Sequence, residues 1–284
     1  MDGERRPTNL YRLVGGPLNL FREMARVNQY LEPAVPAEWI IKRIQFYSYE
    51  LQSRLQSNQT ERDRLALLNH FFFEEKKFIC SPKGRHSDNP QSLLSLAKVF
   101  NKRTGSPSIL ALLYSYLAER VDVPLSLVNL KPTCLLKWND GGRSRFIDMN
   151  RNGVTISSDE LIELLHSRFQ MTSVVSTSLL EDITFDTFIT DYLVSLRATF
   201  DPALDLNQIL FLQDTLIEYL PSQIQLLAER AQMHQSLGNT KLALNDLKRF
   251  FSFCEKDKAP QEIVALYEEL LLMYERNRPN FDLI

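Results

Sequence analysis

The sequence lacks the features of a secreted, membrane-spanning or zinc-stabilised protein. Its three cysteines are far apart and form no Cys-x-x-Cys pair, so we expect neither a disulfide framework nor a structural zinc site. No apolar run reaches the roughly 18 residues of a membrane span. No apolar stretch follows the charges at the start of the chain, so we expect no secretory signal. Together these absences predict a reduced, cytoplasmic protein.

The sequence also lacks a surplus of either charge. Its 33 basic and 35 acidic residues leave a net charge of −2, which gives no reason to expect nucleic-acid or membrane partners. The four histidines are dispersed without the spacing of metal ligands, and we expect neither a metal nor a cofactor. A basic loop at 83–86, with Lys102-Arg103 and with Arg143 and Arg145, would form an anion-attracting surface only if these residues converge.

Helical periodicity dominates the first hundred residues. With 44% hydrophobic residues over 284 positions, the chain can build a sizeable core in one or two domains. From Pro36 onward, apolar residues recur on one helical face. We predict helices at 18–31, from 36 onward, at 60–74 with Thr60 as N-cap, and at 91–102. On the third of these, His70 beside Phe71 is expected in the core or at its boundary.

The stretch from Gly105 to Asp148 changes from helical to strand periodicity. Pro107 suits the first turn of a helix, and the unbroken apolar run that follows predicts a helix buried on most sides, at 108–121. Three strand-like runs follow at 125–130, 133–138 and 145–149, and Asn-Asp-Gly-Gly at 139–142 is a hairpin turn. We therefore predict a mainly helical α+β fold with a small antiparallel sheet.

Helical periodicity returns after the strands. Ser157 and Glu160 have the spacing of a capping box. The Ser- and Thr-rich stretch 170–178 predicts a junction between a core domain, 1–178, and a helical domain, 179–284. In the latter, small and apolar residues match one 34-residue tetratricopeptide unit, with a degenerate copy one period earlier. The matching positions are Leu227, Ala231, His234, Gly238, Ala243, Leu247 and Phe250.

The order of these features resembles the transglutaminase-like superfamily, and more closely its SirB-type bacterial branch. Active members of the superfamily begin the helix with G-x-C-x-x-L-A, and this chain matches at Gly105, Leu110 and Ala111. The cysteine position is Pro107, and the SirB-type pattern G-x-P-x-S-L-A has proline there. The resemblance implies a transglutaminase-like (papain-like) core followed by tetratricopeptide-like repeats, in a bacterial cytoplasmic protein without an established reaction.

The resemblance also assigns three positions of a degenerate catalytic triad. They are Pro107 for the nucleophile, Cys134 for the histidine and Asp148 for the aspartate, and we call them the triad positions. We predict that they lie close together, and that Ser108 and Asn150 join Cys134 and Asp148 in a candidate binding groove. The alternatives are a buried cysteine that only packs, a turn-forming aspartate and a serine without an adjacent base.

Two functional classes remain open. The first is a non-catalytic interaction protein whose former catalytic groove and repeat face bind a protein or peptide, with the oligomeric state unspecified. The second is a hydrolase or acyl-transferase that uses Cys134 and Asp148. A thiolate needs a nearby base or cation at neutral pH, and the sequence offers only Lys131 and Lys137 near Cys134. We therefore favour the first class.

Overall fold

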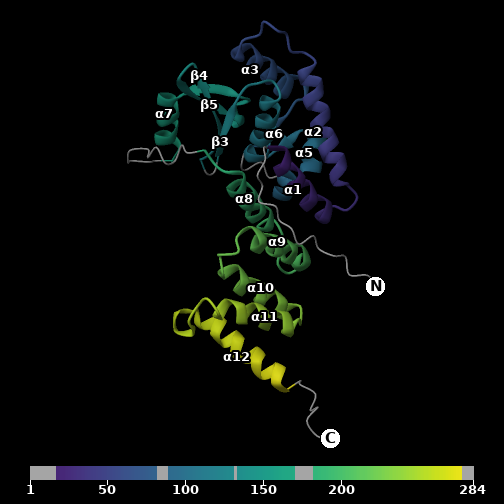
Figure 1. Ribbon diagram of the computed structural model, residues 1–284, viewed down its shortest axis with the longest axis vertical. Helices are drawn as coiled ribbons and strands as arrows, with labels where there is room; N and C mark the ends of the chain where they lie inside the picture. Colours follow the sequence, from purple (N-terminus) through teal and green to yellow (C-terminus); the bar gives the residue numbers. More distant parts are fainter. Residues whose placement is uncertain (1–16, 82–88, 131–132, 170–181, 277–284) are drawn as a thin grey trace. The chain divides into compact units, whose positions relative to one another are not determined.

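The computed structural model describes residues 17–81, 89–130, 133–169 and 182–276 (Figure 1). The chain divides into two compact units, Met1–Ile189 and Thr190–Ile284. The predicted junction at 170–178, and with it the predicted boundary after residue 178, lies outside the described residues. None of the described helices combines the length and apolar character needed to cross a membrane.

The first unit begins with three helices, α1 (Pro17–Leu31), α2 (Ala37–Gln52) and α3 (Glu61–Asn69). Helices α1 and α2 contact each other, and α2 buries the predicted apolar stripe. Thr60 caps α3 as predicted: its hydroxyl accepts from the backbone N–H of Asp63 at 3.2 Å, and the Asp63 carboxylate accepts from the N–H of Thr60 at 2.9 Å. This reciprocal pair satisfies two backbone donors that the helix leaves open.

The predicted helix 60–74 changes character halfway. From His70 to Glu75 the chain forms a π-helix, η1. This turn buries Phe71 and Phe72 and leaves His70 outside, where its ring lies 2.8 Å from the Glu74 carboxylate. The expectation that His70 belongs to the core or its boundary is therefore wrong. Its ring is 55% exposed because the wider turn directs the neighbouring aromatic side chains inward instead.

The predicted helix 91–102 is wrong as a single helix. Two helices replace it, α4 (Pro90–Leu94) and α5 (Leu96–Lys102), separated by Ser95 in an extended conformation. The Ser95 hydroxyl accepts from the N–H of Lys98 at 3.3 Å and donates to Asn28 Oδ1 at 3.1 Å. A serine that bonds to backbone and to a distant amide competes with continuous helical hydrogen bonding. This competition explains the break.

A parallel strand pair was not predicted. It joins β1 (Ile79–Cys80) to β2 (Thr104–Gly105), with Cys80 opposite Gly105. Each strand has two residues, which is too short to show a period of two in the sequence. The pair closes the loop between η1 and the central helix and brings Cys80 to the start of that helix.

The central helix and the main sheet match the prediction. Helix α6 (Pro107–Glu119) buries every residue from Ile109 to Ala118. The antiparallel sheet has the order β3 (Leu125–Leu130), β4 (Thr133–Asp140), β5 (Arg143–Asp148) and β6 (Val154–Ser157). The β4–β5 turn uses Gly141 and Gly142, both with positive φ, as a two-residue hairpin requires. The short strand β6 was not predicted.

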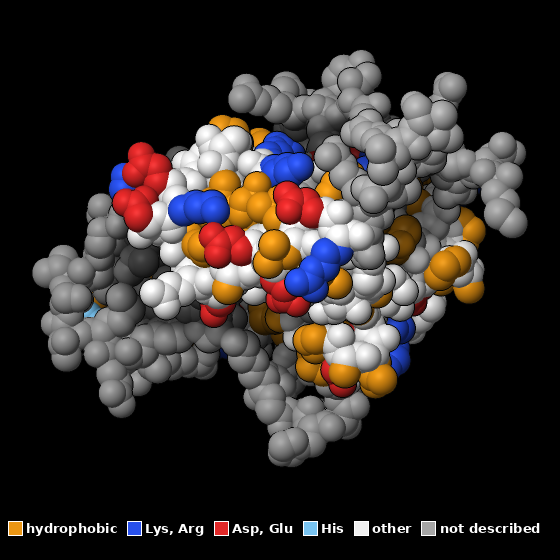
Figure 2. All heavy atoms as spheres, turned by 90° about the horizontal axis from the view of Figure 1, so that it is seen from below, with side chains coloured by type: hydrophobic (Ala, Val, Ile, Leu, Met, Phe, Trp, Pro, Cys, Tyr) orange, Lys and Arg blue, Asp and Glu red, His pale blue; other side chains and the backbone are white. Residues whose placement is uncertain are grey.

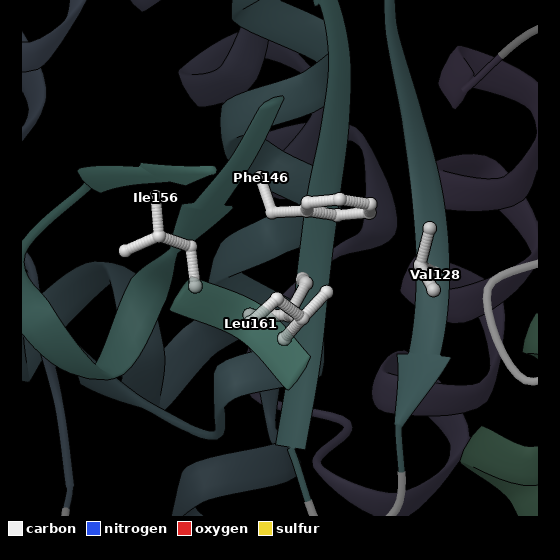
Figure 3. Packing of buried hydrophobic residues seen from close by; sticks show 5 residues of the cluster. Val128, Phe146, Ile156 and Leu161 are labelled. Atoms are coloured by element: carbon white, nitrogen blue, oxygen red, sulfur yellow. The ribbon is translucent and has the colours of Figure 1, made fainter. Parts of the chain in front are cut away.

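The sheet is covered on both faces (Figure 1). Helix α6 contacts β3 and β4, and α7 (Ser158–Phe169) contacts β5 and β6. Beneath α7, one buried cluster joins the strands to Leu161; its members are Val128, Leu135, Phe146, Ile156 and Leu161 (Figure 3). The predicted capping box at the start of α7 is present, with Ser157 N–H donating to Glu160 at 2.6 Å and Glu160 N–H to the Ser157 hydroxyl at 3.2 Å.

Among the described residues of the second unit, the regular elements are helices joined by turns. Helix α8 (Phe185–Arg197) spans the division between the units, and α9 (Leu206–Tyr219), α10 (Gln225–Ser236), α11 (Thr240–Phe251) and α12 (Gln261–Arg276) follow. Successive helices from α9 to α12 contact each other. Most of the predicted anchor positions are buried, namely Leu227, Ala231, His234, Ala243, Leu247 and Phe250.

Polar side chains link these helices at a regular interval. Gln213 of α9 donates to Leu226 O and Glu229 of α10, and Arg197 donates to Gln213 and Glu229. Arg230 of α10 binds Asp214 of α9 and Asp246 of α11, each 16 residues away. The face in Figure 2 carries charges of both signs among apolar side chains, in keeping with the near-neutral composition.

Candidate functional site

The elements that carry the triad positions contact one another. Helix α6 begins at Pro107 and contacts β4, which carries Cys134. It also contacts the short 3-10 helix η2 (Met149–Arg151), which directly follows Asp148. On the sheet, Asp148 pairs with Leu135, the neighbour of Cys134. The helix start and the two adjoining strands are thus assembled, while the close approach of all three side chains stays a prediction.

Two serines occupy the start of α6. The Ser106 hydroxyl accepts from the N–H of Ile109 at 3.3 Å, and it lies 3.1 Å from the Ser108 hydroxyl. Pro107, between them, has neither a nucleophilic atom nor an N–H. The candidate groove residue Ser108 is half-buried, and its described hydrogen bond is to another hydroxyl rather than to a base. A serine without a base is a poor nucleophile.

Cys134 is a buried thiol, and burial is the cause of its shifted pKa. It is 4% exposed, and burial raises the pKa of its thiol to about 12. With a pKa raised so far, the protonated thiol dominates at pH 7. Lys137, which the sequence places nearby, lies with its amine 3.3 Å from the Asp182 carboxylate. Lys131 lies outside the described residues. Reactive cysteines show the opposite shift, toward lower pKa.

Cys80 also belongs to this region, which sequence analysis did not predict. Burial, the negative charge of Asp148 and the Cys134 thiol together raise the pKa of the Cys80 thiol to about 12. Strand β1 also contacts η2, so the geometry agrees with this coupling. The only structural signal for Cys80 is the two-residue pair β1–β2, which sequence periodicity does not reveal. Two protonated thiols and one carboxylate therefore share this region.

Asp148 binds the backbone. It is 2% exposed, and its Oδ1 accepts from the N–H of Asn150 at 2.9 Å, so that it caps η2. Its carbonyl accepts from the N–H of Gly153 at 3.0 Å, which closes the turn into β6. These bonds are those of a turn-forming aspartate. Asn150, the other groove candidate, has an exposed side chain at the surface of this turn.

The histidines lie on other elements. His70 is on η1 and faces the solvent, and His166 is exposed on α7. His234 belongs to the second unit, with its ring 4.0 Å from Asp246, and His86 lies outside the described residues. Within the described ranges, no three His, Cys, Asp or Glu side chains are grouped so that they could hold a metal ion.

The geometry therefore supplies packing and backbone capping. Nucleophilic catalysis of the triad type needs a nucleophile, a base and a group that orients the base. The described residues supply a proline at the first position, a buried protonated thiol at the second and a carboxylate already bonded to backbone at the third.

Comparison with known proteins identifies one family. A model of the Transglutaminase-like superfamily matches residues 38–192, just over half of the chain. The match begins in α2, includes the whole four-stranded sheet and ends in α8.

Individual relatives are distant. F-box only protein 21 of Mus musculus is 33% identical over 86 residues, which are 30% of this chain and only 13% of that protein. UPF0162 proteins align over most of both chains. That of Xylella fastidiosa is 23% identical over 212 residues, 73% of this chain and 74% of its own. That of Vibrio cholerae is 20% identical over 235 residues, 83% of this chain and 86% of its own.

Proposed function

The chain belongs to the transglutaminase-like superfamily, and we propose that it is a non-catalytic member that binds a protein or peptide partner. The observation that carries the proposal is Pro107 at the start of α6, where the superfamily pattern has its cysteine. Proline cannot attack an acyl group, and the hydroxyls on either side of it bond to each other and to the helix backbone. Without a nucleophile at this position, the acyl-transfer reaction of the superfamily cannot begin.

The two thiols near this position support the same proposal. Cys134 and Cys80 both have a pKa raised to about 12, through burial and, for Cys80, also through Asp148 and Cys134. A carboxylate beside a thiol disfavours the thiolate, because like charges repel. Cys134 and Asp148 are buried, and the Asp148 carboxylate serves the η2 turn.

The second unit supplies a further binding surface in this proposal. We interpret its helices as degenerate tetratricopeptide-like repeats. The interpretation is supported by the polar contacts that recur 16 residues apart, because two such steps approach the 34-residue period of that repeat. Stacked helix pairs present extended surfaces to which segments of other proteins bind.

The finer assignment to a SirB-type branch, in the bacterial cytoplasm, is part of the proposal. It is supported by proline in the Gly105-Ser106-Pro107 pattern and by the two bacterial relatives that align with most of this chain. The name of the F-box relative adds nothing to it, since that match covers 13% of that protein.

An activity assay separates this proposal from a cysteine-dependent hydrolase or acyl-transferase that uses Cys134 and Asp148. Hydrolysis of activated esters and peptides, and transfer of glutamine acyl groups to amines, are measured for the wild type and for Cys134→Ala and Cys80→Ala. We expect no rate above buffer in any of them. A rate that disappears in either alanine variant while its circular dichroism is unchanged would establish the enzyme instead.

A binding assay tests the positive half of the proposal. A partner is captured from cytosol with the full chain, purified, and titrated against the wild type and Asn150→Arg, which fills the candidate groove with a long charged side chain. We expect at least about a tenfold loss of affinity, equivalent to roughly 1.4 kcal/mol. The control is Asn58→Arg, the same change at an exposed position between α2 and α3 of the first unit. Equal affinities for the two variants would remove the groove from the proposal.

A further inference from the structure

Three cationic side chains surround the ring of Tyr47 on α2. The guanidinium carbons of Arg43 and Arg103 lie 5.7 Å and 5.3 Å from the centre of this ring, and the amine of Lys76 lies 5.3 Å from it. The ring itself is 2% exposed and is held by three buried aromatic neighbours, which are Phe71, Phe78 and Phe100. Segments far apart in the sequence thus bring three positive charges to one fixed ring.

The acidic side chains of this neighbourhood are engaged by other cations. The Glu50 carboxylate lies 2.6 Å from the Lys76 amine and 3.1 Å from the Arg54 guanidinium. Arg54 also binds Glu75. Lys76 and Arg54 therefore offset the charges of these two carboxylates.

Arg43 and Arg103 are left without an acidic partner. In the part of the chain that the structure describes, neither of them forms an ion pair with a carboxylate. The Nε of Arg43 is buried and, among the same residues, has no hydrogen-bond partner. A buried donor without an acceptor is unfavourable, and an anionic ligand would supply the missing acceptor. The neighbourhood thus carries two positive charges that no acidic side chain offsets.

Both guanidinium groups are held in place and still have free donors. Arg103 donates to the Tyr47 hydroxyl, which occupies one of its five N–H groups. Its backbone has a φ of 58°, a conformation uncommon for arginine, and its carbonyl accepts from the N–H of Ile79 at 2.9 Å. Arg43 stacks on Trp39, with 5.8 Å between the guanidinium carbon and the ring centre. Both arginines are half-buried, so a ligand can reach them from the solvent.

We propose that Arg43 and Arg103 bind a phosphomonoester group, carried by a phosphorylated side chain or by a small phosphorylated molecule. Two unpaired guanidinium groups match the charge of about −1.5 to −2 on such a group at pH 7. Their planar donors also suit its oxygens. Two such charges on a chain with a net charge of −2 are few for an extended polyanion. Neither arginine belongs to the triad positions or to the candidate groove, so the site goes beyond the binding role proposed above.

A titration of the isotope-labelled full chain at pH 7.5 tests the proposal. The probes are acetyl-Gly-phosphoserine-Gly-amide, the same peptide with serine, inorganic phosphate, and the monoanion dimethyl phosphate. Binding is followed by the NMR signal of the Trp39 indole, beside Arg43, and the indole of Trp138 on β4 is the internal control. We expect a saturable shift at Trp39 with the phosphopeptide, none with the serine peptide, and at least about tenfold weaker binding of dimethyl phosphate.

Inorganic phosphate distinguishes the two sources of the group. Binding at least about tenfold weaker than that of the phosphopeptide would support a phosphorylated side chain, because the peptide then adds contacts of its own. Equal binding of the two would support a small phosphorylated molecule.

Two variants and a control complete the test. Arg43→Gln and Arg103→Gln should each weaken phosphopeptide binding at least about tenfold, because each removes one charged donor group. Arg22→Gln, which removes an exposed arginine of α1 bonded to Asn19 at 3.2 Å, should bind like the wild type. Circular dichroism verifies that each variant is folded, and since the two arginines follow different helices, either variant tests the site alone.

Three results would overturn the proposal. They are the absence of a shift at Trp39 up to about 10 mM phosphopeptide, equal binding of the phosphopeptide and either the serine peptide or dimethyl phosphate, and wild-type affinity in the arginine variants. Each of them leaves the activity assay and the Asn150→Arg titration unaffected, so this site and the proposed function fail separately.

Discussion

At the residue scale, two glycines are required for different reasons. Both adopt a backbone conformation that other residues rarely adopt, but only one of them also lacks space for a side chain. Gly142, in the β4–β5 turn, and Gly153, before β6, both have positive φ. A Cβ at Gly142 would meet nothing within 4 Å. A Cβ at Gly153 would lie 2.4 Å from Asn69 Oδ1 and 2.5 Å from Phe73. Only the second glycine is needed for close packing against the π-helix.

The corresponding alanine variants should therefore differ in stability. Gly142→Ala should lower the free energy of unfolding by about 1–2 kcal/mol, the strain of a left-handed backbone. Gly153→Ala should lose that amount and a further 1–3 kcal/mol or so for the overlap with Asn69 and Phe73. Urea denaturation of the two variants measures the difference. Equal losses of stability in the two variants would show that the chain around Gly153 relaxes without a free-energy cost.

Cys134 makes a pH-dependent contribution to stability whose sign follows from burial. Its pKa is raised to about 12 in the folded chain, against about 8.5 for an unfolded cysteine. The contribution is therefore complete below about pH 8.5 and is lost as the pH rises toward 12.

The wild type should accordingly lose stability relative to Cys134→Ala above pH 9. The difference between the two free energies of unfolding should shift by up to about 1.4 kcal/mol per pH unit, because the unfolded thiol ionises and the folded one does not. Urea denaturation at pH 7.5, 9 and 10.5 measures it. A difference that stays constant across this range would mean that Cys134 ionises in the folded chain.

At the element scale, α6 is the centre of the first unit. Its residues from Ile109 to Ala118 are all buried, and it contacts α1, α2, α3, β3 and β4. A helix buried on all sides gains its stability from packing rather than from amphipathicity. Ser106 and Pro107 set its start and thereby place the first of the triad positions. In our proposal this arrangement is the framework of a former catalytic site.

Shortening a side chain at the centre of α6 should strongly lower the free energy of unfolding. Leu113 is 1% exposed, and Leu113→Ala should lower the free energy of unfolding by about 2–5 kcal/mol through lost burial and a cavity. Glu119→Ala, at the exposed end of the same helix, should change it by less than about 0.5 kcal/mol. Chemical denaturation of both variants checks this, and a loss below 0.5 kcal/mol or so for Leu113→Ala would contradict the central role of the helix.

The elements that the sequence predicts correctly are those whose signals lie within a few consecutive residues. The caps at Thr60 and Ser157, the Gly-Gly hairpin and the apolar run of α6 all belong to this class. The break at Ser95 was not predicted because its competing hydrogen-bond partner, Asn28, is 67 residues away. The place of Cys80 was not predicted for the same reason, since it depends on the pairing of two distant segments.

At the scale of the whole molecule, the superfamily scaffold is present, and in our proposal Pro107 and Cys134 stand where its catalytic cysteine and histidine would be. The family match includes the entire sheet and α6. In that proposal both replacements remove a means of making or using a thiolate, whereas Asp148 is retained. The near-neutral charge, with both signs mixed over the face in Figure 2, offers no broad electrostatic attraction to a polyanion. We therefore expect specific recognition at defined sites.

Alkylation measures whether Cys80 and Cys134 are protonated and unreactive in the folded chain. Native chain is treated with iodoacetamide between pH 7 and 10, and labelling of Cys80 and Cys134 is followed by mass spectrometry against the same chain in denaturant. Both cysteines should label at least about a hundredfold more slowly in the native chain at pH 7, with no plateau below pH 10. Rapid labelling of either cysteine at pH 7, with a midpoint below about pH 8, would contradict the claim and indicate an activated nucleophile.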